Sequence, residues 1–302
     1  MQTVEFRFRA HAETEPGAVW RRYFEESWPW YRSWYLSEGE EARPSYAVCA
    51  RMVREHLPEL VPTYERLVEL AGGGDLEARA LSFWHPPPYL AACSQGVSVT
   101  GAAPVLVRNY DYSPSRLEGA VWSTAWGGRR VIGMSDGLWG LLDGMNDAGL
   151  AVSLTFGGSR ATGLGFGIPV VLRYLLQTCT TVAESRAALS RVPLNLAHNV
   201  TVVDARGEVM TAYLGPGRDP TFLDVAVATN HQVTVEWQEH AAATRTVERE
   251  ALMQSLLAAE VPPEEIETAF LAPPLYSSAY SRGFGTLYTA AYRPREGRAE
   301  AA

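Results

Sequence analysis

The sequence predicts an α+β fold in which helices cover the outside of two antiparallel sheets. The first third of the chain carries mostly helical patterns, whereas many short β-prone segments begin near residue 93. From there the order is strands, two helices, strands, helices and a final strand. Runs of strands followed by runs of helices are typical of antiparallel α+β arrangements rather than of a doubly wound sheet.

The first third is predicted to hold one strand and three helices. Residues 3–9 alternate apolar and charged side chains, as a short strand does. Residues 16–35 are dense in Trp, Tyr and Phe at spacings closer to helical than to alternating. A second helix is predicted over 45–70, ended by the glycines at 72–74, and a third over 76–83.

His85 and the three prolines after it break regular structure, and β-prone segments separated by turns follow. The predicted strands up to residue 156 are 94–100, 104–110, 120–126, 130–134, 137–142 and 149–156. Two helices are then expected over 168–179 and 182–192, the second capped by Thr181. The rest is predicted as a hairpin (199–204 and 208–214), a strand (225–229), two helices (244–259 and 264–270) and a last strand (285–292).

Composition and charge argue against several classes of function. The 302 residues carry 26 basic and 34 acidic side chains, a net charge of −8, with no long basic run. Nucleic acid and an anionic membrane are therefore not expected as partners. All the basic residues are arginine, and the absence of lysine removes Schiff-base chemistry, a lysine base and the P-loop lysine.

Cysteine usage and the N-terminus predict the compartment. The three cysteines show no C-x-x-C spacing, which suits a reducing environment rather than a disulfide framework. The first residues carry charges where a signal peptide needs an apolar core, and no apolar stretch is long enough to span a bilayer. We therefore expect a soluble, cytoplasmic protein, with a homo-oligomer left open.

Sequence motifs for metal, dinucleotide or serine chemistry are missing. The six histidines form no H-E-x-x-H and no zinc-spaced pair with cysteine, so no metal or cofactor is expected, although a site built from distant residues stays open. The glycines at 72–74 and 163–167 lack the context of a dinucleotide-binding motif. No G-x-S-x-G elbow occurs.

Cys93 is the best candidate for a nucleophile, because it begins the strand-rich region a few residues after the proline run. Cys49 lies within a helical pattern and Cys179 ends one, as core residues do. A hairpin starting at Cys93 would bring Arg108 and Asp111 back beside the sulfur. A guanidinium lowers a thiol pKa, and a carboxylate orients an amine or a substrate. The alternative for Cys93 is a buried core cysteine, and the alternative for Arg108 and Asp111 is an ordinary surface ion pair.

Four motifs follow one another between residues 85 and 293. They are CSQ…VRNYDY from Cys93, DGMNDAGLAVSLTFGG at 143–158, ATNH at 228–231 and GTLYT at 285–289. In this order they resemble the acyl-CoA:6-aminopenicillanic acid acyltransferase family, which belongs with the choloylglycine hydrolases to the N-terminal nucleophile hydrolases.

The resemblance implies a four-layer αββα fold and self-cleavage of an inactive precursor between Ala92 and Cys93. Residues 1–92 would be the N-terminal helical segment and residues 93–302 the catalytic segment of one structural domain. The Cys93 thiol would attack the carbonyl of Ala92, which stands where the family commonly has glycine, and water would open the resulting ester. Cys93 then carries an α-amine with a reference pKa of ~7.7–8.0, suited to a general base. One residue thus supplies nucleophile and base.

The same resemblance implies roles for other residues. Asp111 would hydrogen-bond the α-amine, and Arg108 would stabilise the thiolate or orient the acyl oxygen. Asn230 would donate its amide to the tetrahedral oxyanion. The backbone or the hydroxyl near Thr155, where choloylglycine hydrolases carry Asn, would supply a second donor, and Arg282 resembles a late arginine of the substrate pocket.

Two further segments have structural interpretations. Asn146 and Asp147 are expected to form a turn between two sheet strands. The N-terminal aromatic residues are expected to pack in the core, with a secondary hypothesis that Trp28, Trp30 and Trp34 form an apolar acyl pocket or lid.

The sequence therefore predicts a self-processing, cofactor-free cysteine amidohydrolase or acyltransferase. It would act on a carbon–nitrogen amide bond of a small N-acyl molecule through a thioester, with water or an amine as acceptor and an acyl-CoA donor left open. One alternative is an unprocessed hydrolase in which Cys93 pairs with His198 or His231. The other is a non-catalytic binding relative of the same fold.

Overall fold

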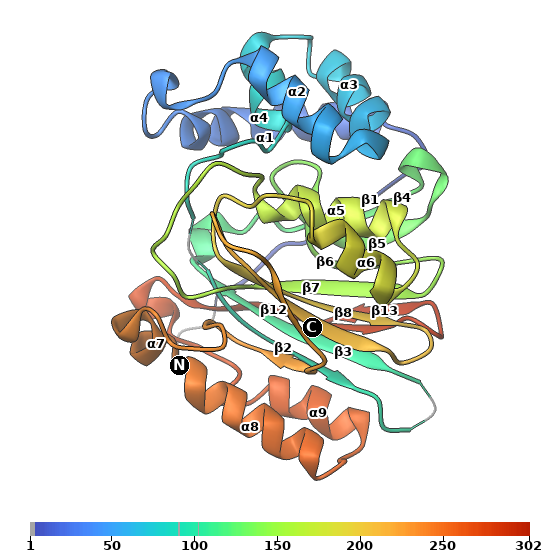
Figure 1. Ribbon diagram of the computed structural model, residues 1–302, viewed down its shortest axis with the longest axis vertical. Coiled ribbons are helices and arrows are strands. Elements are labelled where there is room, and N and C mark those ends of the chain that lie inside the picture. The colour runs from blue at the N-terminus through green and yellow to red at the C-terminus, as the bar shows by residue number, and fades with distance from the viewer. Residues whose placement is uncertain (1–3, 90, 102) are drawn as a thin grey trace.

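Two β-sheets face each other at the centre of the computed structural model, which describes residues 4–89, 91–101 and 103–302 (Figure 1). Within these residues the larger sheet has eight strands, in the order β1 (Arg9–Glu13), β4 (Ala120–Thr124), β5 (Val131–Asp136), β6 (Gly140–Asn146), β7 (Leu150–Phe156), β8 (His198–Asp204), β9 (Val209–Leu214) and β10 (Thr221–Leu223). The smaller sheet has the order β11 (Val227–Ala228), β2 (Ala92–Ser98), β3 (Val105–Tyr112), β12 (Gly285–Arg293) and β13 (Arg298–Ala301). The pairs are antiparallel, apart from β1 and β4.

Helices cover the outer faces of both sheets. The eight-stranded sheet is covered by α5 (Ile168–Thr178) and α6 (Val182–Leu189), and the five-stranded sheet by α8 (Thr246–Ala258) and α9 (Pro263–Phe270). A short helix, α7 (Gln238–Thr244), precedes α8. The helix–sheet–sheet–helix order confirms the predicted α+β sandwich of four layers.

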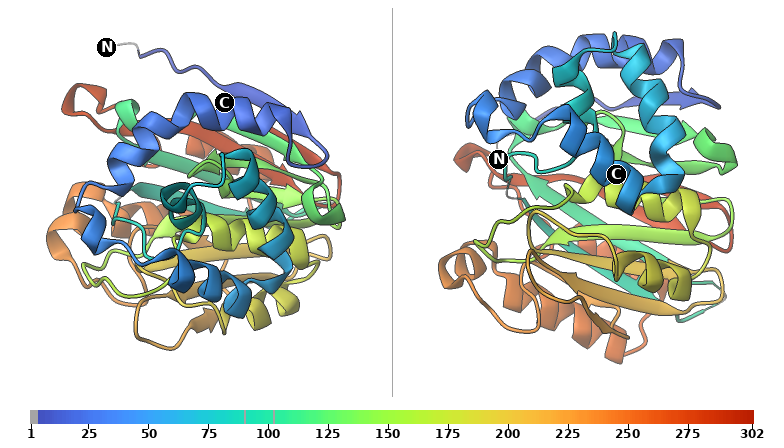
Figure 2. Two further views of the ribbon diagram at one scale, coloured as in Figure 1. Left: turned by 90° about the horizontal axis from the view of Figure 1, so that it is seen from above. Right: turned by 45° about the horizontal axis from the view of Figure 1, so that its top comes forward.

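The N-terminal helices form a further layer beyond α5 (Figures 1 and 2). They are α1 (Ala18–Tyr35), α2 (Tyr46–His56), α3 (Val61–Leu70) and α4 (Asp75–Leu81). This layer is attached to the rest of the fold by buried tryptophans: the indole of Trp20 donates to the Leu138 carbonyl at 3.0 Å, and that of Trp139 to the Leu81 carbonyl at 3.0 Å.

Two predicted elements of this layer are wrong. The strand expected over 3–9 begins only at Arg9, because that is where the chain meets β4; residue 3 lies outside the described residues. The single helix expected over 45–70 is two helices joined by a 3₁₀ turn at Pro58–Leu60. Proline lacks the N–H that a continuous helix would use, so the helix ends before Pro58.

A third difference concerns the helix expected over 244–259. Arg245 adopts a left-handed conformation, with φ of 52°, and divides this segment into the end of α7 and the whole of α8. The other predicted strands and helices after residue 93 are confirmed, with their ends shifted by a few residues.

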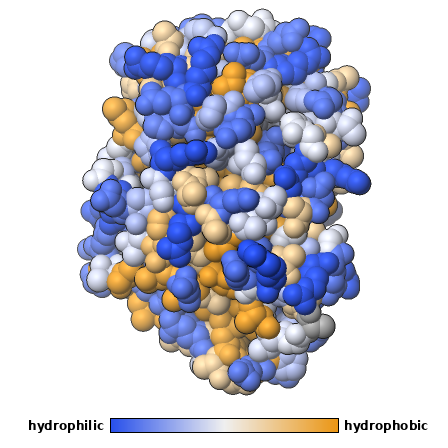
Figure 3. All heavy atoms as spheres, turned by 45° about the vertical axis from the view of Figure 1, so that its right-hand side comes forward, coloured by the Kyte–Doolittle hydropathy of each residue, from blue (hydrophilic) through white to orange (hydrophobic). Residues whose placement is uncertain are grey.

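The core follows the alternation of the strands. Along β3, Leu106 joins the main core between the sheets, whereas Val105 and Val107 form a smaller apolar cluster with Met253 of α8 and Phe270 of α9. In Figure 3, hydrophobic residues gather toward the lower half of the visible face, where α8 and α9 lie. Among the described residues, no helix is long and apolar enough to cross a membrane.

Candidate active site

Cys93 is the second residue of β2, and its side chain is fully buried. The predicted hairpin is confirmed: β2 pairs with β3 so that Ala92 lies opposite Asp111, Cys93 opposite Tyr110 and Gln95 opposite Arg108. Side chains alternate between the two faces of a strand, so Arg108 and Asp111, three residues apart, lie on opposite faces. The expectation that both would be neighbours of the sulfur is therefore corrected, because only Arg108 shares the inner face with the Cys93 side chain.

On the inner face, between the sheets, Arg108 contacts the thiol directly. Its Nη2 donates to Cys93 Sγ at 3.3 Å, while its Nη1 donates to the Tyr288 hydroxyl at 2.7 Å and to the Asp143 carboxylate. Burial raises the pKa of the Cys93 thiol, and the Arg108 charge opposes this shift.

On the outer face, Asp111 pairs with an arginine that the sequence did not single out. Arg249 Nη1 lies 3.2 Å from Asp111 Oδ2, and the Thr286 hydroxyl donates to Asp111 Oδ1 at 2.6 Å. Burial raises the pKa of Asp111, opposed first by Arg249 and then by Thr286. The alternative of a surface ion pair between Arg108 and Asp111 is wrong, since both are buried and each has a different partner.

Arg249 also holds the backbone around Cys93. Its Nη1 donates to the Cys93 carbonyl at 2.9 Å and to Ser94 Oγ at 2.7 Å. One helical turn later, Met253 packs on Gly96 so tightly that a Cβ there would lie 2.4 Å from the methionine methyl carbon. Glycine in β2 thus accommodates the Met253 side chain where α8 packs on this strand.

Asn230 lies at the peptide bond before Cys93. Its Oδ1 accepts the Cys93 backbone N–H at 2.9 Å and Arg249 Nη2 at 2.7 Å. Its Nδ2 donates to the Phe156 carbonyl at 3.2 Å. Gly158 allows this approach, because a Cβ there would lie 2.3 Å from the Asn230 carbonyl oxygen. The sequence placed Asn230 in the site, but in the intact chain its oxygen, not its amide nitrogen, faces Cys93.

The Thr155 hydroxyl has another partner, whereas Arg282 lies at a cavity beside the Ala92–Cys93 bond. The Thr155 hydroxyl is fully buried and donates to the Thr229 carbonyl at 2.7 Å, so it supports the segment before Asn230 instead of offering a donor to the site. Arg282 is exposed on the rim of a cavity of about 710 Å³ that Ala92, Asp111 and Arg249 also line.

The two histidines of the alternative hydrolase have other partners. His231 Nε2 lies 3.1 Å from Glu250, and its Nδ1 lies 3.0 Å from the Thr246 hydroxyl. His198 Nδ1 lies 3.3 Å from the Leu196 carbonyl, and burial lowers the pKa of His198 to about 4. Neither ring hydrogen-bonds Cys93 in the described part of the chain.

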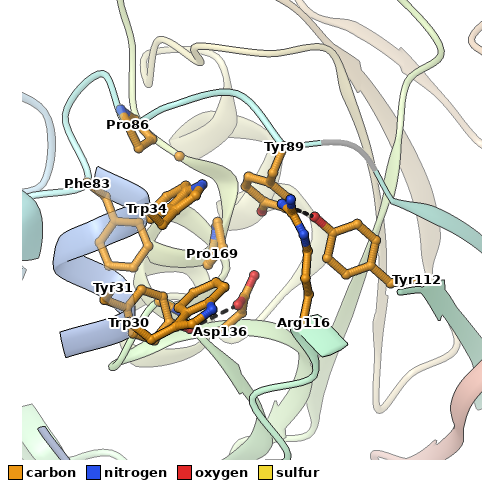
Figure 4. A pocket seen from close by; sticks show the side chains of 12 residues that line it. Trp30, Tyr31, Trp34, Phe83, Pro86, Tyr89, Tyr112, Arg116, Asp136 and Pro169 are labelled. Atoms are coloured by element: carbon orange, nitrogen blue, oxygen red, sulfur yellow. Dashed lines mark hydrogen bonds between the residues drawn. The ribbon is translucent and has the colours of Figure 1, made fainter. Parts of the chain in front are cut away.

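A second cavity, of about 30 Å³, lies beside the inner face (Figure 4). Trp30 and Trp34 of α1 line it together with Phe83, Tyr89 and Tyr112, and Asp136 and Arg116 complete its wall. Tyr112 is two residues beyond Tyr110, the partner of Cys93 in the sheet, so this wall residue lies about 7 Å along β3 from the level of Cys93.

Of the three tryptophans in the acyl-pocket hypothesis, Trp30 and Trp34 line this cavity. Trp28 does not line the cavity but stacks on Phe24, with ring centroids 5.2 Å apart.

The turn expected at Asn146 and Asp147 is confirmed: Asn146 Oδ1 accepts the backbone N–H groups of Ala148 and Leu150 between β6 and β7. Over the described residues, no cluster of three or more His, Cys, Asp or Glu side chains is arranged to hold a metal ion.

Residues 99–302 match the family model of acyl-coenzyme A:6-aminopenicillanic acid acyl-transferase. The chain belongs to this family. The match supports an enzyme of the N-terminal nucleophile class that hydrolyses amides or transfers acyl groups. No curated protein matches the chain.

Solved structures give more distant likenesses. Penicillin V acylase from Agrobacterium tumefaciens is 16% identical, with a TM-score of 0.47, and the match covers 69% of this chain and 82% of that one. An N-acylethanolamine-hydrolyzing acid amidase orthologue from Caenorhabditis elegans is 14% identical, with a TM-score of 0.46, covering 67% and 93%. A mutant conjugated bile acid hydrolase from Clostridium perfringens is 11% identical, with a TM-score of 0.41, covering 70% and 92%.

For this acyl-transferase family member, sequence reasoning missed two charged residues. Arg249 lies inside an ordinary helical pattern, and only the packing of α8 on β2 places it in the site. Asp143 begins one of the quoted motifs, and its charge inside a buried strand was the signal that could have identified it.

Proposed function

We propose that this protein is a self-processing cysteine amidohydrolase or acyltransferase that acts on the amide bond of a small N-acyl molecule through a thioester. The observation that carries the proposal is that several polar side chains lie around one peptide bond, between Ala92 and Cys93. Arg108 contacts the Cys93 sulfur, Asn230 accepts the N–H of the Ala92–Cys93 bond, and the Asp111–Arg249 pair lies beside it. Burial of the thiol fits a precursor, because no substrate reaches the sulfur before the chain opens.

Cleavage would proceed by an N-to-S acyl shift. The Cys93 sulfur bonds to the Ala92 carbonyl carbon, the carbon–nitrogen bond breaks, and the leaving nitrogen takes the thiol proton. Water then hydrolyses the thioester, which gives the Ala92 carboxylate and restores the thiol. The product is an N-terminal Cys93 with a free α-amine.

The same groups would serve the catalytic cycle. The α-amine, held by Asn230 Oδ1 and close to Asp111, accepts the thiol proton as Sγ attacks the substrate carbonyl. An amide nitrogen carries two hydrogens, and Asn230 Nδ2 gives one to Phe156, so the other is left for the oxyanion. Water or an amine then takes the acyl group from the thioester.

The N-terminal segment would remain attached after cleavage. It contributes β1 to the larger sheet, and the Tyr31 hydroxyl accepts the Gly137 N–H at 2.9 Å. Its tryptophans Trp30 and Trp34 would help to bind the acyl group as a lid, since they line the aromatic cavity, which at about 30 Å³ holds no more than a water-sized group in the intact chain. Residues 1–92 and 93–302 would thus be two chains of one structural domain.

Intact-mass spectrometry with N-terminal sequencing of freshly purified protein tests the proposal. We expect two fragments, the second beginning at Cys93, and a Cys93→Ala variant that stays whole. Cys179→Ala, which removes a buried cysteine elsewhere, is the matched control and should cleave like wild type. An intact wild-type chain that hydrolyses amides, and loses this activity with a His231 substitution, would instead support the unprocessed cysteine–histidine hydrolase. A folded chain whose Cys93 is never labelled by a thiol-reactive amide or thioester probe would support a non-catalytic relative.

A further inference from the structure

Asp143 is a fully buried carboxylate on β6 that touches neither Cys93 nor the bond before it. Its Oδ2 accepts the Tyr288 hydroxyl at 2.6 Å and Arg108, and its Oδ1 accepts the Tyr292 hydroxyl at 2.5 Å. Asp143 belongs to the eight-stranded sheet, whereas its three partners lie on β3 and β12 of the other sheet. The carboxylate therefore joins the two sheets at Arg108.

We propose that Asp143 is a positioning residue that aims the Arg108 guanidinium at the Cys93 sulfur; this rests on the proposed function. The guanidinium is planar and rigid. Because Asp143 and Tyr288 both fix Nη1, the remaining freedom of Nη2 is small, and it lies 3.3 Å from Sγ. Without the carboxylate, Arg108 would keep only the tyrosine contact and would leave the sulfur part of the time.

The charges that shift the thiol pKa include Arg108, the partner of Asp143. Burial raises the pKa of Cys93; Arg108 lowers it, Asp111 raises it, and Arg249 on α8 lowers it. Asp143 bonds Arg108, and Arg108 bonds the sulfur, so the contact route from Asp143 to the thiol runs through Arg108. A loosened Arg108 thus predicts a higher thiol pKa, the same direction as removal of Arg108.

The test follows iodoacetamide alkylation of Cys93 against pH, with kcat and KM for a chromogenic N-acyl amide. We expect Asp143→Ala to raise the apparent thiol pKa by about one unit and to lower kcat about tenfold with little change in KM. Asp143→Asn, which keeps one acceptor oxygen, should recover part of both effects. In an Arg108→Gln background, Asp143→Ala should change neither quantity further.

The control is Asp204→Ala, a buried aspartate on β8 that accepts the Arg206 backbone N–H at 2.9 Å and should leave the thiol pKa unchanged. An unchanged or lowered thiol pKa in Asp143→Ala, or a full loss of kcat that persists in the Arg108→Gln background, overturns the proposal. If Asp143→Ala does not fold, Tyr292→Phe decides: a raised thiol pKa and a reduced kcat support the role, and wild-type values overturn it. If wild type neither cleaves itself nor hydrolyses amides, the proposed function fails. The buried sulfur is then closed to iodoacetamide, and the difference in thiolate ultraviolet absorbance against pH between each chain and its Cys93→Ala counterpart still decides the role of Asp143.

Discussion

Replacing Arg249 by Gln removes the cation that compensates the buried Asp111. The two side chains are each 3% exposed, and Arg249 also bonds the Cys93 carbonyl and Asn230. Breaking a buried ion pair by removing one partner typically costs about 3–5 kcal/mol, because the other charge is left uncompensated. We therefore expect Arg249→Gln to be one of the more destabilising single substitutions in this chain.

This cost corresponds to a measurable fall in Tm. An unfolding entropy of about 2.1 cal/mol/K per residue gives about 630 cal/mol/K for 302 residues, so Tm should fall by about 5–8 °C. Both chains should carry Cys93→Ala, so that self-cleavage does not differ between them. Differential scanning calorimetry then gives Tm and the unfolding enthalpy directly.

The loss of stability in Arg249→Gln should depend on pH, and the titration of Asp111 determines the direction of that dependence. Burial already raises the folded-state pKa of Asp111, and loss of Arg249 raises it further. A carboxyl whose folded-state pKa is raised contributes stability that is fully present below its unfolded pKa of ~3.9 and is lost as pH rises through the folded value. The deficit of Arg249→Gln should therefore be small near pH 4 and grow toward neutral pH.

Arg245→Gln is the matched control, because Arg245 lies directly before α8 and pairs with Glu248 in solvent, with side chains 55% and 54% exposed. Its Tm should not change measurably. An equal deficit for Arg249→Gln at pH 5 and pH 8 would show that Asp111 is not the group responsible. No deficit at all would refute the ion pair.

Asn230→Ala should lower kcat about 100- to 1000-fold in processed enzyme, because one oxyanion donor is lost; wild-type turnover of an N-acyl amide would remove Asn230 from that role. His231→Ala should keep kcat of the same order as wild type, since His231 bonds Glu250 and Thr246 instead of Cys93; an inactive but folded variant would point to the histidine mechanism. Trp34→Ala should raise KM for aromatic and long-chain acyl amides more than it lowers kcat, and an unchanged KM across an acyl series would separate the aromatic cavity from acyl binding. The pH profile of kcat/KM should rise as the α-amine loses its proton, with a midpoint at ~7.7–8.0; a midpoint near the ordinary histidine pKa would contradict the amine as base.

The amino-acid sequence alone determined the parts of this protein that depend on local order. The alternation and turns after residue 93 set the β2–β3 hairpin, and its register brings Arg108 to the thiol. The period of two along β3 also fixes Asp111 on the opposite face, a consequence available from spacing alone. The order of strands and helices likewise predicted helices on the outside of two sheets, because runs of strands followed by runs of helices are typical of such layered arrangements.

Only the tertiary structure decided which charged groups compensate one another. Arg249 reaches Asp111 across a sequence separation of 138 residues, and Asp143 reaches Arg108 from the other sheet. No local pattern encodes such pairs, because a buried charge takes its partner from whichever element packs against it. Here that depended on the packing of α8 against β2, and on two sheets that meet face to face.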